Sequence, residues 1–196
     1  MSEDVPSRPE ASGETAPKPE AADEADLSVL LIWHAYPPKD WAFADERLEE
    51  AARAAFQAGS SGDPSQSYEV AIVFDDDAAL QALNRDFRGK DKPTNVLSFP
   101  ADPTSVGAPF EEAQSLGDVI LSLDTLGREA KALEIPPQDH ATHLVVHGVL
   151  HLLGFDHMDE TQATEMEALE TEILGTLGIA DPYGETETPR LELQNE

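Results

Sequence analysis

Three histidines within eleven residues constrain this chain more than any other feature of its sequence. They follow the spacing H-x3-H-x5-H in the run His147-Gly148-Val149-Leu150-His151-Leu152-Leu153-Gly154-Phe155-Asp156-His157. On a helix, His147 and His151 lie one turn apart on the same face. Gly154 is the residue type that ends helices in a left-handed turn, which would bring His157 back toward the other two. The run therefore predicts a helix, a turn and a returning histidine.

Three imidazoles that converge on one point suit a zinc ion. Three protein ligands leave the fourth coordination position open for water, as in catalytic zinc sites. We therefore predict that His147, His151 and His157 bind one zinc ion. The alternative is that His147 and His151 merely interrupt an apolar helix. Histidines on a buried face are costly unless they are hydrogen-bonded or ligated, and this favours the metal site.

The other histidines are expected outside the metal site. His143 lies one turn before His147, but positions 143 and 151 are roughly 12 Å apart along a helix axis. A zinc–nitrogen bond is only about 2.0–2.1 Å long, so one ion cannot join both ends. His143 and His140 are therefore predicted to lie beside the ligands or at the surface. His34 lies in an apolar, strand-like segment and is predicted to be a structural histidine.

Composition limits the class of protein. The chain has no cysteine, which excludes disulfides and a zinc finger and fits a reducing cytosol. Its first residues are acidic and no apolar segment follows, so we expect no signal peptide. The most apolar stretches, 27–36 and 143–155, are too short to span a bilayer. The net charge of −28 argues against nucleic-acid binding over most of the surface, because phosphate contacts need Lys and Arg.

One basic cluster interrupts this acidity. Four of the twelve Lys and Arg residues fall within 85–92, namely Arg85, Arg88, Lys90 and Lys92. The cluster is either an ordinary solvated loop or an RNA contact. Arg88 is a fixed cation whose planar donors suit phosphate. The neighbouring Phe87 is predicted by its helical register to pack in the core. A zinc site together with a phosphate-binding arginine would suit hydrolysis of a phosphodiester.

Hydrophobic periodicity predicts an α/β (α+β) single domain, with a small mixed sheet of about four strands and about five to six helices. Strands are expected at 27–35, 68–74, 96–99 and 119–123. Helices are expected at 40–58, after a cap at 75–77, at 125–134, at about 137–153, and after a cap at Asp159. The domain is expected over 27–180, between a disordered acidic tail at 1–26 and an acidic tail at 181–196.

Together the basic loop and the histidine run resemble the YbeY family of bacterial endoribonucleases, which mature ribosomal RNA. The resemblance covers roughly residues 27–178, and Phe155 stands where many family members have Tyr. The segments that carry it, in the family's order, are Arg88-Gly89-Lys90-Asp91-Lys92-Pro93-Thr94-Asn95-Val96-Leu97-Ser98-Phe99-Pro100, Leu116-Gly117-Asp118-Val119 and the run from His147 to His157.

This resemblance implies a zinc-dependent, single-strand-specific endoribonuclease of the cytoplasm. It implies action near the 3′ end of small-subunit ribosomal RNA and in ribosome quality control. The three histidines would be the zinc ligands, and Arg88 would match a basic residue important for activity. Arg85, Lys90 and Lys92 are further candidates for contacts with single-stranded RNA. The implied partners are the ribosome, a small-subunit ribosomal protein and the GTPase Era, with no membrane.

Several alternatives stay open at the level of sequence. Zinc peptidases carry H-E-x-x-H, in which the Glu is the general base, but Gly148 takes its place here. This counts against a peptidase and leaves the proton acceptor unassigned. Either water or the RNA 2′-OH could attack the phosphate. Asp156 either orients a histidine or closes a turn, and we favour the turn. A non-catalytic, zinc-stabilised assembly factor and a zinc hydrolase of other substrates are the alternative functions.

Overall fold

The structure is a computed structural model that describes residues 25–63, 65–102 and 113–184. The segments 1–24 and 185–196 of the two predicted tails, and residues 103–112 of the predicted loop, lie outside these ranges. Within the described ranges there are four strands and five helices, which confirms the predicted fold class. The strands are β1 (Leu27–Trp33), β2 (Tyr68–Asp75), β3 (Val96–Pro100) and β4 (Gln114–Ser122). The helices are α1 (Asp45–Gly59), α2 (Asp77–Arg88), α3 (Leu123–Ala132), α4 (Pro137–Leu152) and α5 (Glu160–Thr176).

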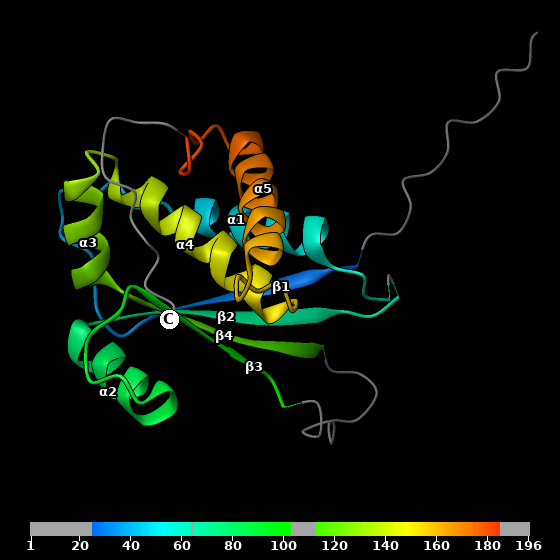
Figure 1. The fold of residues 1–196 in the computed structure, drawn as a ribbon, viewed down its shortest axis with the longest axis horizontal. Coiled ribbons are helices and arrows are strands. Elements are labelled where there is room, and N and C mark those ends of the chain that lie inside the picture. The colour runs from blue at the N-terminus through cyan, green and yellow to red at the C-terminus, as the bar shows by residue number, and fades with distance from the viewer. Residues whose placement is uncertain (1–24, 64, 103–112, 185–196) are drawn as a thin grey trace, which may run out of the picture.

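The strands form one mixed sheet in the order β1-β2-β4-β3. β1, β2 and β4 run parallel to their neighbours, whereas β3 pairs antiparallel with β4 at one edge. Helices α1, α4 and α5 lie on one side of the sheet and α2 lies on the other (Figure 1). Alternation predicts one buried face for β2, but Ile72, Val73 and Phe74 are all buried. The reason is that helices cover both sides of a central parallel strand.

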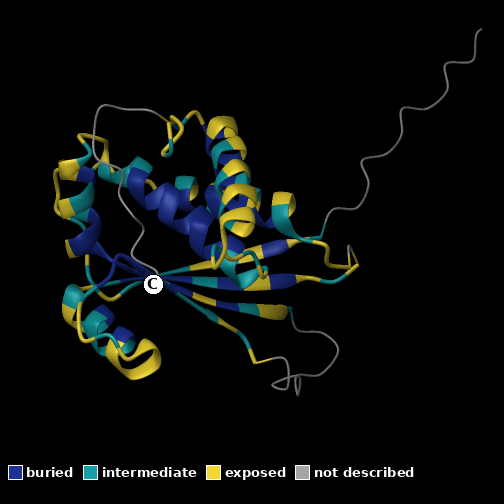
Figure 2. Cartoon of the chain, viewed as in Figure 1, coloured by how far each residue is buried: buried dark blue, intermediate teal, exposed yellow. Residues whose placement is uncertain are grey.

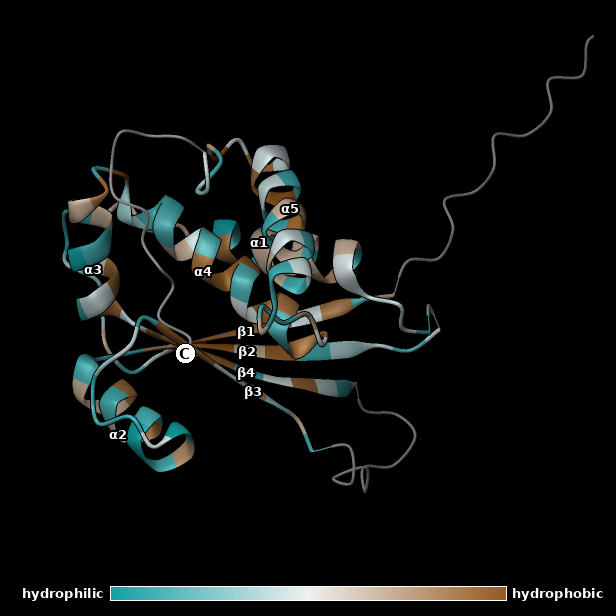
Figure 3. Ribbon diagram, in the orientation of Figure 1, coloured by the Kyte–Doolittle hydropathy of each residue, from teal (hydrophilic) through white to brown (hydrophobic). Residues whose placement is uncertain are grey.

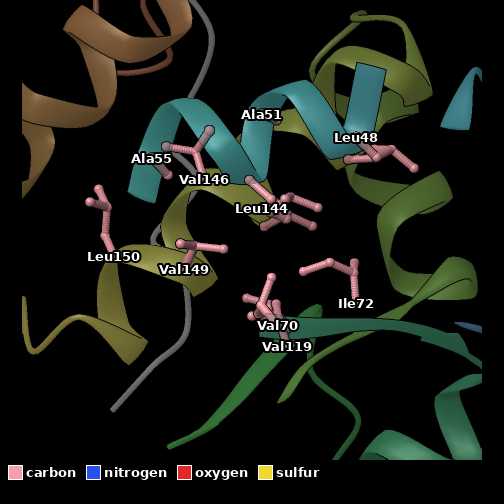
Figure 4. Close-up of a cluster of buried hydrophobic side chains, with 14 of the residues drawn as sticks. Leu48, Ala51, Ala55, Val70, Ile72, Val119, Leu144, Val146, Val149 and Leu150 are labelled. Carbon is pink, nitrogen blue, oxygen red and sulfur yellow. The ribbon is translucent and has the colours of Figure 1, made fainter. Parts of the chain in front are cut away.

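Helix α4 forms the centre of the larger layer. Every residue from His140 to Leu150 is buried, because the helix contacts the sheet on one side and α1, α3 and α5 on others. A helix enclosed in this way is buried all round, as its colour in Figure 2 shows. Figure 4 shows its apolar side chains meeting those of α1 and of the strands. The strands are strongly hydrophobic over part of their length and become polar toward one end (Figure 3).

Two predicted element boundaries are wrong. The first helix begins at Asp45, so Trp41 is not on its apolar face. Trp41 lies in the preceding loop instead, where its ring stacks on Phe43 with centroids 5.7 Å apart. The fourth strand begins at Gln114 rather than Val119, because pairing with β2 continues beyond the predicted end. The predicted start of α4 at Pro137 and the Asp159 cap of α5 are confirmed.

The prediction that Phe87 packs in the core is also wrong. Its side chain is 68% exposed, and its ring contacts Phe99 edge-on at a centroid distance of 5.1 Å. β3 is an edge strand of the sheet, and among the described residues no strand lies beyond it. His34, predicted to be structural, follows β1 and is largely exposed, with Nδ1 3.0 Å from Asp75 Oδ2. In the described part of the chain, no helix is long and apolar enough to span a bilayer.

Candidate metal centre

The end of α4 folds back as the sequence predicts. Gly154 has φ +94°, in the left-handed region that favours glycine. The Gly154 N–H donates to the carbonyl of His151 at 3.0 Å, and the Phe155 N–H donates to that of Leu150 at 3.1 Å. These two bonds are those of a Schellman motif, which satisfies the last carbonyls of a helix. The turn returns the chain toward the last turn of α4 and carries His157 with it.

The three predicted ligands converge at this turn. One ligand nitrogen from each of His147, His151 and His157 lies within 4.8 Å of those of the other two. The Nε2 atoms of His147 and His151 are 3.0 Å apart. The ring centroid of His157 lies 5.7 Å from that of His147 and 5.0 Å from that of His151. This group could hold one metal ion.

Hydrogen bonds to the remaining ring nitrogens show that the group fits a cation. His147 Nδ1 lies 2.7 Å from Glu170 Oε1, and His151 Nδ1 lies 3.0 Å from the carbonyl oxygen of Phe155. Both partners are acceptors, so each Nδ1 carries the proton and each Nε2 keeps a lone pair. Two lone pairs facing each other at 3.0 Å repel unless a cation lies beside them. His157 Nε2 is buried without a hydrogen-bond partner among the described residues.

The protonation state of His151 suits the same role. Burial, and then the neighbouring His147 and His157, lower the pKa of His151 to about 4. At neutral pH the ring is therefore neutral, which is the state that a metal ligand must have.

A pocket of about 320 Å³ opens beside the histidines and joins two segments distant in sequence. His151 and His157 line it from the end of α4 and the turn that follows. Arg88 lines it from the end of α2, with Ser98 of β3 between the two segments. The volume is at the lower end of the range for small-molecule sites. The pocket therefore places the Arg88 cation and two candidate metal ligands around one space.

Comparison with known proteins identifies the family. The sequence profile described as Endoribonuclease YbeY matches residues 38–178. The endoribonuclease YbeY of Rhodospirillum rubrum is 49% identical over 82% of this chain and 80% of its own length. That of Rhizobium meliloti is 45% identical over 82% of this chain and 95% of its own length. A solution structure from Thermotoga maritima is 20% identical and covers 77% of this chain and 92% of that chain, with a TM-score of 0.47.

This chain belongs to the endoribonuclease YbeY family. The resemblance predicted from the basic loop and the histidine run is confirmed, and relatives in the family are named as nucleases that cut RNA. The family match begins after β1, which is nevertheless paired along its whole length with β2.

The structure divides the predicted basic residues into two groups. Arg88 lines the pocket, whereas Arg85, Lys90 and Lys92 are not among the described residues that line it. Arg85 forms an exposed ion pair with Asp86 at 2.8 Å. The backbone N–H of Lys90 donates to the carbonyl of Asn84, and this bond closes the C-terminal end of α2. These three cations are therefore not part of the pocket lining.

Position 148 contains no general base because it faces the sheet. A Cβ atom on Gly148 would collide with the side chain of Val119 and would lie 3.2 Å from Ser98 Oγ. The Ser98 hydroxyl donates to the Gly148 carbonyl at 3.0 Å, which ties β3 to α4 at this point. Asp156 lines the pocket, and its Oδ1 accepts the backbone N–H of His157 at 2.8 Å. This bond closes the turn, which is the role that the sequence favours for Asp156.

Glu170 is the residue that sequence analysis missed. It is fully buried on α5 and accepts bonds from His147 and, at 2.8 Å, from His143 Nε2. Burial acts to raise the pKa of Glu170, but these hydrogen bonds outweigh it and hold the pKa far below its usual range. One signal could have revealed it. Position 170 lies four residues after Met166 and three before Ile173, so it shares the apolar face of α5.

His143 lies beside the candidate ligand His147, with ring centroids 6.4 Å apart, which is one of the two predicted placements, and His140 lies one turn farther from the ligands along α4. Neither lies at the surface, since both are buried in α4. His143 reaches Glu170, while His140 Nε2 lies 2.8 Å from Glu129 Oε2. Along α4, His140 thus pairs with Glu129, whereas His143 and His147 share Glu170.

Proposed function

We propose that this chain is a zinc-dependent, single-strand-specific endoribonuclease that acts in ribosomal RNA processing. His147, His151 and His157 would hold one zinc ion, and Arg88 would bind the phosphate to be cleaved. Family membership supports the endoribonuclease activity, since the matching profile and relatives are so named. The donor set supports zinc, because three neutral imidazoles with an open position suit that ion.

The observation that carries this proposal is the shared pocket. Arg88 and two of the three candidate ligands line one space although more than sixty residues separate them in sequence. A guanidinium group offers paired donors to phosphate oxygens and stays charged at every physiological pH. Placed opposite a metal site, it would bind the phosphate and stabilise the charge that develops on it.

The chemistry divides between the ion and the chain. When bound, zinc would polarise a phosphoryl oxygen or activate an attacking water. Glu170 and the Phe155 carbonyl hold the two helix histidines with their Nε2 atoms toward the site. Arg88 orients the phosphate, and the pocket walls hold the nucleotide beside it.

One substrate distinguishes the two candidate nucleophiles. RNA with a single 2′-deoxy sugar at the scissile position lacks the 2′-OH but keeps the phosphate. Normal cleavage of this RNA would exclude attack by the 2′-OH, and an uncut substrate would exclude attack by water.

We propose further that the substrate is the 3′ end of small-subunit ribosomal RNA during late maturation in the cytoplasm, and that the enzyme also serves ribosome quality control. The ribosome, a small-subunit ribosomal protein and the GTPase Era are the partners proposed to deliver the RNA. The net charge of −28 supports a need for such partners, because the chain repels RNA over most of its surface.

The test compares cleavage of a single-stranded RNA and its duplex by purified protein, together with metal analysis. His151→Ala is expected to lose both zinc and cleavage. Arg88→Ala is expected to keep zinc and to lose about 10²–10³-fold in cleavage rate, as for a lost charge-stabilising donor. Arg53→Ala, an exposed arginine of α1 that pairs with Glu49 far from the basic cluster in sequence, is the matched control and should stay within a few-fold of the wild type. Cleavage that survives both His151→Ala and Arg88→Ala would contradict the site.

A metal-free protein separates catalysis from a structural role. If the chelated protein keeps its fold by circular dichroism and loses cleavage, the ion serves chemistry. If it unfolds on chelation, the non-catalytic assembly factor becomes the better description.

A further inference from the structure

Glu170 stands out because its carboxylate is enclosed by the fold. Among the described residues it is the one acidic side chain in the buried class, with no exposed area. Its neighbours along α5 on the same face are the apolar Met166, Ile173 and Leu174. Burying a carboxylate costs several kcal/mol unless hydrogen bonds replace its water. Its place in the core therefore requires specific partners.

Each carboxylate oxygen has its own partners. Oε1 accepts from His147 Nδ1 at 2.7 Å. Oε2 accepts from His143 Nε2 at 2.8 Å and from the Tyr183 hydroxyl at 2.5 Å. His143 and Tyr183 also contact each other, with their rings perpendicular and their centroids 5.8 Å apart. Two donors from different elements thus hold one oxygen in place and leave the other for His147.

The contact with His147 controls which ring nitrogen faces the candidate metal site. An acceptor at Nδ1 keeps the proton on that nitrogen, so that Nε2 carries the lone pair. Nε2 is the atom that lies 3.0 Å from His151 Nε2. His147 is only 2% exposed, so water has little access to take the place of Glu170.

We propose that Glu170 is the positioning residue of the metal centre: it fixes the tautomer and orientation of His147, and so sets the affinity of the site for zinc. This inference rests on the proposed role of the three histidines as ligands. A carboxylate that accepts from a ligating imidazole makes the ring a stronger donor and fixes its direction, and losing it lowers metal affinity about 10–100-fold. Its negative charge also offsets part of the charge of a divalent ion.

The same geometry gives Tyr183 and His143 a supporting role. They hold the carboxylate against rotation, and they act on the oxygen that does not touch the ligand. Tyr183 lies beyond the end of α5, in residues that the sequence assigns to the acidic tail. The segment at 181–184 is therefore attached to the metal centre through Glu170.

The test uses Glu170→Gln, which keeps the side-chain volume and removes the charge. Zinc affinity of the metal-free protein is measured by competition with a chromogenic chelator. We expect Glu170→Gln to bind zinc about 10–100-fold more weakly. Glu165→Gln, an exposed position on the same helix, is the matched control and should bind like the wild type. His143→Gln removes a contact to the other oxygen and should have the smaller effect of the two buried variants.

A second measurement needs no substitution at Glu170. Long-range proton–nitrogen spectra of the metal-free wild type distinguish Nδ1–H from Nε2–H rings, and loss of signals in His147→Gln identifies the ring. The inference requires an Nδ1–H tautomer for His147. An Nε2–H ring, or a folded Glu170→Gln protein with wild-type zinc affinity, would overturn it. Failure of the proposed function has a different signature: wild-type protein that binds zinc tightly and cuts no RNA.

Discussion

At the scale of single residues, two histidines of the candidate metal centre have their Nδ1 atoms held by different neighbours. His147 is held by a side chain from α5, and His151 by the backbone carbonyl of Phe155. At the turn, the carboxylate of Asp156 accepts a hydrogen bond from the backbone N–H of His157. The contribution of Phe155 to His151 is a main-chain atom, so the side chain at position 155 is not needed for it. What this bond requires is the backbone conformation at 154–155.

Gly154 is therefore the residue on which the position of His157 depends. Gly154→Ala places a Cβ atom at φ +94°, a conformation that costs an L-residue roughly 1–2 kcal/mol. We expect a lower free energy of unfolding by about that amount. We also expect weaker zinc binding, because the relaxed turn moves His157 away from α4. Urea unfolding of metal-free protein and chelator competition measure the two effects.

Gly175→Ala is the matched control for this change. Gly175 lies in α5, is exposed, and has open space where its Cβ would be. Alanine there should leave zinc binding unchanged and raise stability by up to about 1 kcal/mol. Equal zinc affinity in wild type and Gly154→Ala would show that the glycine does not position the ligand.

At the scale of elements, α4 carries the ligands because it is fixed against the sheet. Gly148 lets the helix approach β4 closely, and the Ser98 hydroxyl bonds to its carbonyl from β3. A side chain at 148 would separate helix and sheet, so the metal centre and the core depend on the same contact.

Gly148→Ala should destabilise the protein by overpacking. The new methyl group would collide with Val119, and strain of this kind costs about 1–3 kcal/mol. Val119→Ala alone should also destabilise, because it leaves a cavity. In the double variant the cavity accepts the methyl group. The stability lost by the double variant should therefore be smaller than the sum of the losses in the two single variants. Additive losses in urea unfolding would contradict the close contact.

The junction of α2 and α3 predicts a specific pH dependence. Asp77 Oδ1 accepts from Ser122 and Thr125, and Oδ2 accepts from Arg128 at 2.8 Å. Burial acts to raise the pKa of Asp77, but the bonds from Arg128, Ser122 and Thr125 outweigh it and lower the pKa. A carboxyl whose pKa is lower in the folded state stabilises the protein at pH values above its unfolded-state pKa of about 3.9. That stability is lost as the pH falls through the folded pKa.

Asp77→Asn isolates this effect. We expect it to lower the free energy of unfolding by about 1 kcal/mol at pH 7, a modest value because the pair is partly exposed. The difference from wild type should shrink as the pH falls from 5 to about 3. Glu165→Gln, whose carboxylate is exposed on α5, is the control for lost charge. A difference that stays constant over this range would exclude Asp77 as the titrating group.

At the scale of the whole molecule, the net negative charge repels RNA, whereas the candidate site must attract it. The chain carries −28, and its two predicted tails, 1–26 and 181–196, account for only −10 of it, leaving −18 on the domain. The pocket meanwhile presents Arg88, and Arg85, Lys90 and Lys92 lie within four residues of it in the sequence. RNA is thus attracted at one place and repelled over most of the remaining surface.

This charge distribution predicts weak and local RNA binding. If one to four cations contact phosphates, log K should fall against log salt with a slope between about −0.7 and −2.8. Fluorescence anisotropy with the His151→Ala variant measures this without cleaving the RNA. Adding Arg88→Ala should make the slope shallower by about 0.7. Tight binding to naked RNA at high salt would contradict a single local contact surface.

The sequence by itself determined those features that depend on neighbouring residues. Helix periodicity, the Pro137 start, the Asp159 cap and the Gly154 turn follow from backbone conformations that each residue type allows, and the structure confirms them. The convergence of the three histidines follows as well, because one helical turn and one left-handed turn fix it locally. Family membership follows from the same local motifs.

Tertiary structure decided what depends on contacts between distant segments. Phe87 has the register of a core residue, yet it is exposed because β3 is the last strand of the sheet. Arg88 and its three basic neighbours look alike in sequence, and only packing of α2 beside β3 brings one of them into the pocket. Glu170 looks like one more acid on an acidic helix. Its role arises because α5 packs on α4, which places its carboxylate against His147 and out of water.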